Sequence, residues 1–477
     1  MALNSNVRAV FLYTVFTYFS GALFQGDLLS VYIFKLTSST LDVGAISAAR
    51  GIAMVIFALP LGLISSKFRR DQMLKSASIL GYITLGLTVY VFWGLKPGMK
   101  SLLIFYATFG LWGVFTAATN PNLESIFADS VETGKRSKIF TIKQMTIQFA
   151  ASAGPLLTIA YYAFLGEGLD SWDLGRLRVI LLVGTGICFI GLSTMWLFDD
   201  DKSLGAESES HISAHRSASR KSSNSILEGV EGAISMENDE EERDIPCCFI
   251  PRRLIPHVIA VCDLFMSIGA GMTIKFFPLF FVEKYNLSPI SLSLVYFSNL
   301  IFGAFVSWFF QRMSALYFNR VIVMVAAKFI GTACLFVIAT FDPKYEHIMI
   351  IAPLFVLRTA VQNSTGGIKR SLLMDCVKKK KRAQWNSFES ITRFSWSGSA
   401  YLGGWIVEKY SYETMFLATA CLYSVAAVEM CLLFAADVPL EKKREDNEAN
   451  PIPMRRTSSG LPDAYDYHPL KKRTAIN

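Results

Sequence analysis

Apolar residues in this chain come in long blocks separated by short polar stretches. Each block holds about 20 or more residues, enough to cross a ~30 Å hydrocarbon core as a helix. Only helices and closed barrels satisfy their backbone groups in lipid, and the short alternating strands of a barrel are absent from the sequence. The pattern predicts an all-α integral membrane protein with twelve transmembrane helices, at 9–34, 43–65, 74–95, 101–128, 137–164, 178–198, 254–282, 290–311, 321–342, 347–375, 384–407 and 412–436.

One long polar segment divides the twelve predicted helices into two sets of six. It is rich in Ser, Glu and Asp, with stretches such as AESESHISAHRSASRKSSNS and MENDEEERD, so it cannot bury a core. The end of the chain has a similar composition. We therefore predict a cytoplasmic N-tail (1–8), a six-helix bundle (9–198), a disordered cytoplasmic linker (199–253), a second six-helix bundle (254–437) and a disordered cytoplasmic C-tail (438–477).

The two halves repeat each other at a constant offset. The shared frame, S-x3-D-x-V-x4-R, lies at the cytoplasmic end of the fourth and the tenth helix, and GALFQGD in the first helix aligns with GAGMTIK in the seventh. The frame's residues are Ser125, Asp129, Val131 and Arg136 in one half and Ser371, Asp375, Val377 and Arg382 in the other. A duplicated six-helix unit is typical of transporters. We expect two pseudo-symmetric bundles that face each other across a central cavity.

Charge and cysteine usage narrow the class further. Lys and Arg gather in the C-tail, the linker and alternate loops, which places both termini on the cytoplasmic side. The first apolar block is too long for a cleavable signal peptide. The eight cysteines form no CxxC, and none of the five histidines lies in the middle of a helix. We predict no enzymatic site, metal, cofactor or nucleic-acid partner.

Charged and polar residues inside the helices are the candidates for substrate or coupling contacts, because burying them in lipid is costly. These candidates are Asp27, Arg50, Asn120, Asp263, Lys275, Asn299, Arg358, Gln362 and Asn363. Depth along the helices suggests two ion pairs, Asp27 with Arg50 and Asp263 with Arg358, the second near the midplane. The alternative is that such pairs only hold each bundle together.

Other positions suggest gating and bending. Asp129 and Asp375 occupy matching places, as do Arg136 and Arg382, so we expect ion pairs between helices and across the halves when the cytoplasmic side is closed. Simple helix-end stabilisation is the alternative. Gly154-Pro155 predicts bending of the fifth helix. Short basic motifs ending at Ser219 and Ser458 make kinases candidate partners.

The architecture and the D-x-V-x4-R frame resemble the major facilitator superfamily. The loop after the second helix resembles that family's gating motif, with Gly62, Lys67 and Arg70 in place but Ser66 where the family has aspartate. This departure puts the family's usual gating contact in doubt. Gly154-Pro155 resembles, more weakly, the multidrug-efflux branch. The resemblance implies that helices 1, 4, 7 and 10 line the cavity.

We interpret the chain as a secondary active transporter of a small organic solute that works by alternating access. Proton-coupled export is the preferred mode. The alternatives are a nutrient uniporter or importer, and a non-transporting sensor that retains the fold. We expect a multi-pass protein of the plasma membrane or an internal membrane, with the lipid bilayer, the solute and protons as its partners.

Overall fold

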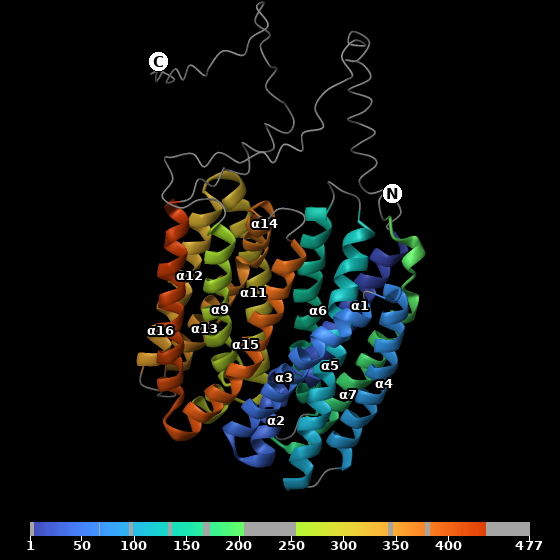
Figure 1. Ribbon diagram of the computed structural model, residues 1–477. Helices are drawn as coiled ribbons and strands as arrows, with labels where there is room; N and C mark the ends of the chain where they lie inside the picture. The colour runs from blue at the N-terminus through green and yellow to red at the C-terminus, as the bar shows by residue number, and fades with distance from the viewer. Residues whose placement is uncertain are drawn as a thin grey trace, which may run out of the picture.

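The chain folds into helices that form two halves of six membrane crossings each, side by side (Figure 1). The structure is a computed structural model, which describes residues 4–65, 67–94, 99–131, 136–165, 172–204, 254–341, 347–376 and 382–435. No strand occurs in these ranges. Eleven crossings are long and apolar enough for a membrane. The twelfth is α15 (Arg382–Lys409), which is long enough but rich in polar residues.

The predicted fold class is confirmed, with helix ends close to those expected from the sequence. The first half comprises α1 (Ser5–Phe24), α2 (Asp27–Thr37), α3 (Thr40–Ser65), α4 (Arg70–Gly94), α5 (Met99–Asp129), α6 (Arg136–Leu165) and α7 (Leu174–Thr194). The second comprises α9 (Ile255–Ile274), α10 (Phe277–Tyr285), α11 (Pro289–Leu316), α12 (Arg320–Thr340), α13 (Ile348–Ser364), α14 (Gly366–Cys376), α15 and α16 (Tyr412–Cys431).

Three crossings are broken into two helices each, a feature that apolar pattern alone did not predict. The breaks separate α1 from α2, α9 from α10 and α13 from α14. Gly26 is required at the first break, because a Cβ there would lie 2.7 Å from the carbonyl oxygen of Ala22. Pro278 opens α10 in the second break, where a missing N–H does no harm. The first two breaks fall in the first crossing of each half.

The halves meet through α3 against α15, α6 against α11 and α2 against α10. α3 and α15 approach closely at glycines: a Cβ on Gly404 would lie 2.7 Å from the carbonyl oxygen of Thr40. Thr40 donates a hydrogen bond to the carbonyl of Gly404 (3.1 Å), and Ser39 donates to Glu408 (3.0 Å). We call this end of the bundle the Thr40 end, and the opposite end the Arg70 end.

The ordered part of the first half continues past the predicted boundary at residue 198. Residues 199–204 include a short 3-10 helix, η2 (Asp200–Lys202), and pack against the Arg70 end. The remainder of the predicted linker and the predicted C-tail lie outside the described residues, and so do the candidate kinase motifs at Ser219 and Ser458.

Candidate functional site

Gln25, at the break between α1 and α2, lies at the centre of a polar cluster between the halves. Arg50 of α3 donates to its side-chain oxygen (2.7 Å) and, more weakly, to Thr116 of α5 (3.4 Å). Lys275, the last residue before the break into α10, donates to the main-chain oxygen of Gln25 (2.9 Å). This carbonyl lies at the end of α1, where no helical N–H is available to it. The two halves therefore contact each other where both helices break.

Asp27 begins α2 and is the carboxylate nearest this cluster. Lys275 acts on it electrostatically, but Asp27 forms no ion pair with any residue in the described ranges. It lines a small cavity of about 20 Å³, large enough for a water molecule. Tyr296 of α11 lines the same cavity, and its buried hydroxyl has no hydrogen-bond partner among described residues. The cavity is thus shared by both halves.

The expected ion pair between Asp27 and Arg50 is not formed. Arg50 points to Gln25 and Thr116 instead. The residues are at similar depth, as the sequence indicated, but depth does not fix the direction of a side chain around the helix axis. The break at Gly26 turns the chain between Gln25 and Asp27, so the neutral amide meets the guanidinium and the carboxylate faces the cavity.

The expected pair of Asp263 with Arg358 is also wrong, because each has another partner. Asp263 of α9 forms an ion pair with Lys369 of α14, with 2.7 Å between the carboxylate oxygen and the ammonium nitrogen. Arg358 of α13 is buried between the rings of Phe277 and Tyr423, and donates to the Tyr423 hydroxyl (3.2 Å). A cation over an aromatic face is stabilised without a carboxylate. Both contacts lie wholly within the second half.

The remaining candidates divide between the core and the cavity-facing helices. Gln362 is buried and accepts from the buried Lys328 of α12 through both its oxygens, at 3.4 Å each. Asn299 of α11 has a buried side-chain oxygen without a partner among described residues, three positions after Tyr296 on the same helix. Asn120 is half-buried on α5, one turn beyond Thr116, whereas Asn363 is exposed.

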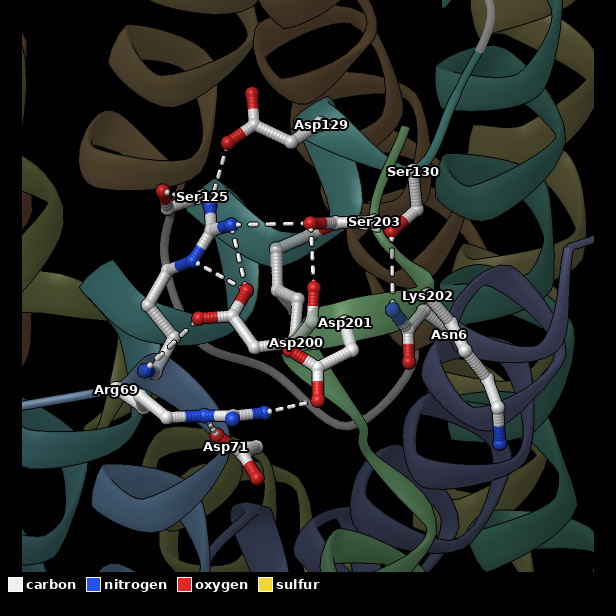
Figure 2. Close-up of polar contacts among 12 residues, drawn as sticks. Asn6, Arg69, Asp71, Ser125, Asp129, Ser130, Asp200, Asp201, Lys202 and Ser203 are labelled. Carbon is white, nitrogen blue, oxygen red and sulfur yellow. Dashed lines mark hydrogen bonds and ion pairs between the residues drawn. The ribbon is translucent and has the colours of Figure 1, made fainter. Parts of the chain in front are cut away.

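At the Arg70 end, a second polar cluster ties four segments of the first half together (Figure 2). Arg70 donates to Asp200 through two nitrogens (2.9 and 2.6 Å) and to Asp129 of α5 (2.5 Å). Asn6 of α1 donates to Ser130 (3.3 Å) and to the main-chain oxygen of Asp199 (2.8 Å). We call the contacts of Arg70, Asp129, Asp200 and Asn6 the Arg70 cluster.

Arg69 extends this cluster at the surface. It pairs with Asp201 (2.9 Å) and Asp71 (3.1 Å). The hydrogen bond to Asp201 is the main reason that the pKa of Arg69 is raised. The hydrogen bond from Lys202 likewise holds the pKa of Asp199 below its ordinary value. The segment that follows α7 is therefore held to the rest of the half by its ion pairs with Arg69 and Arg70.

Among the described residues Asp129 pairs with Arg70, so its predicted pairs with the arginines of the S-x3-D-x-V-x4-R frame stay predictions. Arg70 is the first residue of α4 and follows the loop after α3, so this part of the chain does reach the end of α5 although Ser66 replaces the family's aspartate. Gly62 and Lys67 of the same loop region are exposed. Ser66 and the side chains of Arg136, Asp375 and Arg382 lie outside the described residues.

Gly154 and Pro155 lie within a single continuous helix, α6. Gly154 is in close contact with α1, because a Cβ there would lie 2.6 Å from that of Ala22. Pro155 lines the cavity that contains Asp27. These two residues therefore shape the α1–α6 contact beside the first break.

Sequence reasoning missed several residues of these clusters: Thr116, Tyr296, Lys369, Asp200 and Tyr423. Lys369 carried a usable signal, since it is a charge within the predicted tenth helix. Tyr296 carried a weaker one, because it precedes Asn299 by three positions on one helix face. Asp200 gave none, since it was assigned to the linker.

Comparisons with known proteins agree on one family and one fold. The sequence model described as Major Facilitator Superfamily matches residues 10–400 and 259–465. A search of curated proteins by sequence found no match. Solved structures of similar fold include a bacterial homologue of the human lysosomal transporter Spinster, inward-facing and unoccupied, at a TM-score of 0.60 and 13% identity over 90% of this chain and 96% of that chain.

Two other solved structures show the same likeness. A bacterial homologue of the iron transporter ferroportin, in an inward-facing state, has a TM-score of 0.62 and 13% identity over 91% of this chain and 100% of that chain. A D-xylose–proton symporter has a TM-score of 0.61 and 13% identity over 92% and 98%. Because the family model covers most of the sequence, this chain belongs to the major facilitator superfamily and is a membrane transporter.

Proposed function

We propose that this transporter moves a small organic solute by alternating access, with its binding site at the broken helices between the halves. The contact of Lys275 with the Gln25 carbonyl carries the proposal. Broken helices in corresponding positions of a repeat commonly surround a transport site, because their free ends present backbone groups to a ligand. Asp27, Arg50 and Tyr296 lie around this contact, and Asn120 and Asn299 lie on the adjoining helices.

The two ends of the bundle supply the gates in this proposal. At the Thr40 end, the α3–α15 contact joins the halves and is the closed gate. At the Arg70 end, the Arg70 cluster braces the inner surface of the first half. We place the Arg70 end and both termini on the cytoplasmic side. Lys and Arg concentrate at that end of the predicted topology. Asp375, Arg382 and Arg136 remain candidates for the matching brace and for contacts between halves.

We further propose that Asp27 carries the coupled proton. The cation that acts on it electrostatically, Lys275, belongs to the other half, so rocking the halves changes the charge beside Asp27. Asp263 is less suited, because its partner Lys369 moves with it in the same half. Proton-coupled export is the mode this arrangement favours. Asp263, Arg358, Gln362 and Asn363 then serve the internal framework of the second half.

The test is solute flux in proteoliposomes that contain the purified chain, with and without an imposed pH gradient. Proton-coupled transport predicts counterflow without a gradient and accumulation only with one. Counterflow that the gradient does not change indicates a uniporter. Absence of counterflow for every solute class, in protein that remains folded, indicates a sensor and contradicts transport.

A further inference from the structure

The charges around the two helix breaks do not balance. Arg50 and Lys275 are both cationic, and both use Gln25 as their acceptor, one its amide oxygen and the other its main-chain oxygen. Neither forms an ion pair with a carboxylate in the described part of the chain. Among the described residues Asp27 is the single carboxylate that acts on either of them. One positive charge of this described cluster therefore has no negative partner, and an uncompensated charge within a membrane is costly.

We propose that the transported solute is an organic anion, whose anionic group binds beside Arg50 and Lys275 and supplies the missing negative charge. This inference rests on the proposed transport function and specifies its substrate class. A guanidinium offers several N–H donors in a planar fork that suits a carboxylate, sulfonate or phosphate. Neutral acceptors such as Gln25 and Thr116 hold Arg50 only until a stronger, charged acceptor arrives.

The second half adds features that suit an anion. α10 begins two residues after Lys275, and no side chain caps its N-terminal end, where every residue of the first turn except Pro278 has an N–H group. Free N–H groups at a helix N-terminus carry partial positive charge and attract anions. Tyr296 adds a buried hydroxyl without a partner among described residues. Lys275, the N-terminal end of α10 and the Tyr296 hydroxyl all belong to the second half. Arg50 approaches the same interface from the first half.

The second half also contains buried positive charges farther from the helix breaks. Arg358 and Lys328 are buried cations held by aromatic rings, a tyrosine hydroxyl and Gln362, and neither is paired with a carboxylate among the described residues. We expect these two cations to add to the positive potential that Arg50 and Lys275 produce between the halves. Fields from buried charges are weakly screened and reach several ångströms.

The test measures this potential without knowing the solute. A cysteine is introduced as Asn120→Cys, on α5 one turn, or ~6 Å, from the acceptor Thr116. The probes are 2-sulfonatoethyl methanethiosulfonate, an anion, and 2-(trimethylammonium)ethyl methanethiosulfonate, a cation, applied to the full chain in detergent. The ratio of their rates is normalised to the ratio at an exposed position, Lys67→Cys. Protein without the added cysteine corrects for the eight native cysteines.

We expect the normalised ratio to favour the anion by about tenfold or more, since a charge within several ångströms at low effective dielectric changes local ion concentrations by this order. Arg50→Met and Lys275→Met should each lower the ratio, Arg50→Lys and Lys275→Arg should preserve it, and Asp27→Asn should raise it. A ratio near one, a preference for the cation, or no reaction with either probe overturns the proposal.

A second measurement separates this inference from the proposed function. Counterflow is measured with matched probes: benzoate as the anion, benzamide as the neutral analogue and benzylammonium as the cation. Counterflow of the neutral or cationic probe alone contradicts the anion class while transport stands. An anion-selective rate ratio with no counterflow of any solute contradicts transport while the anion site stands.

Discussion

The ammonium group of Lys275 lies 2.9 Å from the main-chain oxygen of Gln25, and the two residues come from opposite halves of the protein. The acceptor is available because α1 ends there, and the donor is in place because α9 ends at the neighbouring residue. One break thus supplies a carbonyl and the other a cation. A contact of this kind is lost when the halves separate, which links the state of the site to the arrangement of the bundles.

Gln25→Leu should remove the side-chain acceptor of Arg50 while keeping the main-chain acceptor of Lys275. A hydrogen bond to a charged group contributes about 1.5–3 kcal/mol, so thermal stability should fall by that order. Gln25→Glu is the matched variant: its carboxylate would pair with Arg50, restore stability and compete with an anionic solute. Thermal unfolding and counterflow of the two variants check this. Equal stability of Gln25→Leu and the parent chain would show that Arg50 does not depend on Gln25.

The Asp263–Lys369 pair should behave as a structural unit of the second half. Lys369→Met leaves the Asp263 carboxylate within the membrane region without its cation. Asp263→Asn leaves the Lys369 ammonium without its carboxylate. Removing both charges should therefore harm the protein less than removing either one. Both side chains keep some exposure, so each single loss should amount to about 1–2 kcal/mol rather than unfolding. A double-mutant cycle by thermal unfolding measures the coupling, and strictly additive losses would rule the pairing out.

The α3–α15 contact should fix the balance between states. Gly404→Leu places a side chain where a Cβ alone would lie 2.7 Å from the Thr40 oxygen, so closure at the Thr40 end should weaken by about 1–3 kcal/mol. The matched control is Gly62→Leu on α3, where a Cβ meets nothing within 4 Å. The readout is disulfide cross-linking between Ser39→Cys and Glu408→Cys. Unchanged cross-linking in Gly404→Leu would mean that this contact does not hold the gate.

The twelve membrane-crossing helices could be predicted because the length and position of each apolar block directly indicate where the chain crosses the membrane and how deep each residue lies. The helix breaks were not predictable in this way, since Gly26 and Pro278 occur within apolar sequence that also suits an unbroken helix. The predictions of ion-pair partners were wrong for a geometric reason. The break at Gly26 turns the chain between Gln25 and Asp27, so the similar depth of Asp27 and Arg50 did not make them partners. Gln25, two residues earlier, had the required direction.

The Arg70 cluster shows a different limit. Asp129 was found by the repeat, but its partner Arg70 begins α4 after a loop that departs from the family motif, and Asp200 lies in a segment of polar composition that was assigned to the linker. Contacts between residues far apart in sequence follow from the packing of α1, α4, α5 and α7. No spacing within one segment encodes them.

Asp200→Asn should release the segment that follows α7 from the Arg70 end. Asp200 accepts two hydrogen bonds from the Arg70 side chain, whereas Asp129 accepts one. Partly exposed pairs contribute about 0–1 kcal/mol each, so the protein should stay folded while the segment loosens. Reaction of Ser203→Cys with a maleimide should quicken more in Asp200→Asn than in the control Asp201→Asn, whose partner Arg69 is at the surface. Equal rates would argue against a specific clamp.

Proton coupling should depend on Asp27 and not on the other carboxylates within the helices. Asp27→Asn removes the only carboxylate beside Lys275 and Arg50 in the described part of the chain, so accumulation driven by a pH gradient should be abolished, while counterflow, which needs no proton movement, should remain. Asp263 and Glu124 provide matched controls, because each is held by a lysine of its own half, Lys369 and Lys143. Rocking the halves leaves those pairs intact, so Asp263→Asn and Glu124→Gln should lower protein stability or yield but keep the ratio of driven accumulation to counterflow. The measurement is that ratio in proteoliposomes of equal protein content.

Loss of coupling in Asp263→Asn with normal coupling in Asp27→Asn would move the proton site into the second half. Loss of counterflow together with coupling in Asp27→Asn would instead make this carboxylate part of solute binding, because exchange requires the solute site but not the proton.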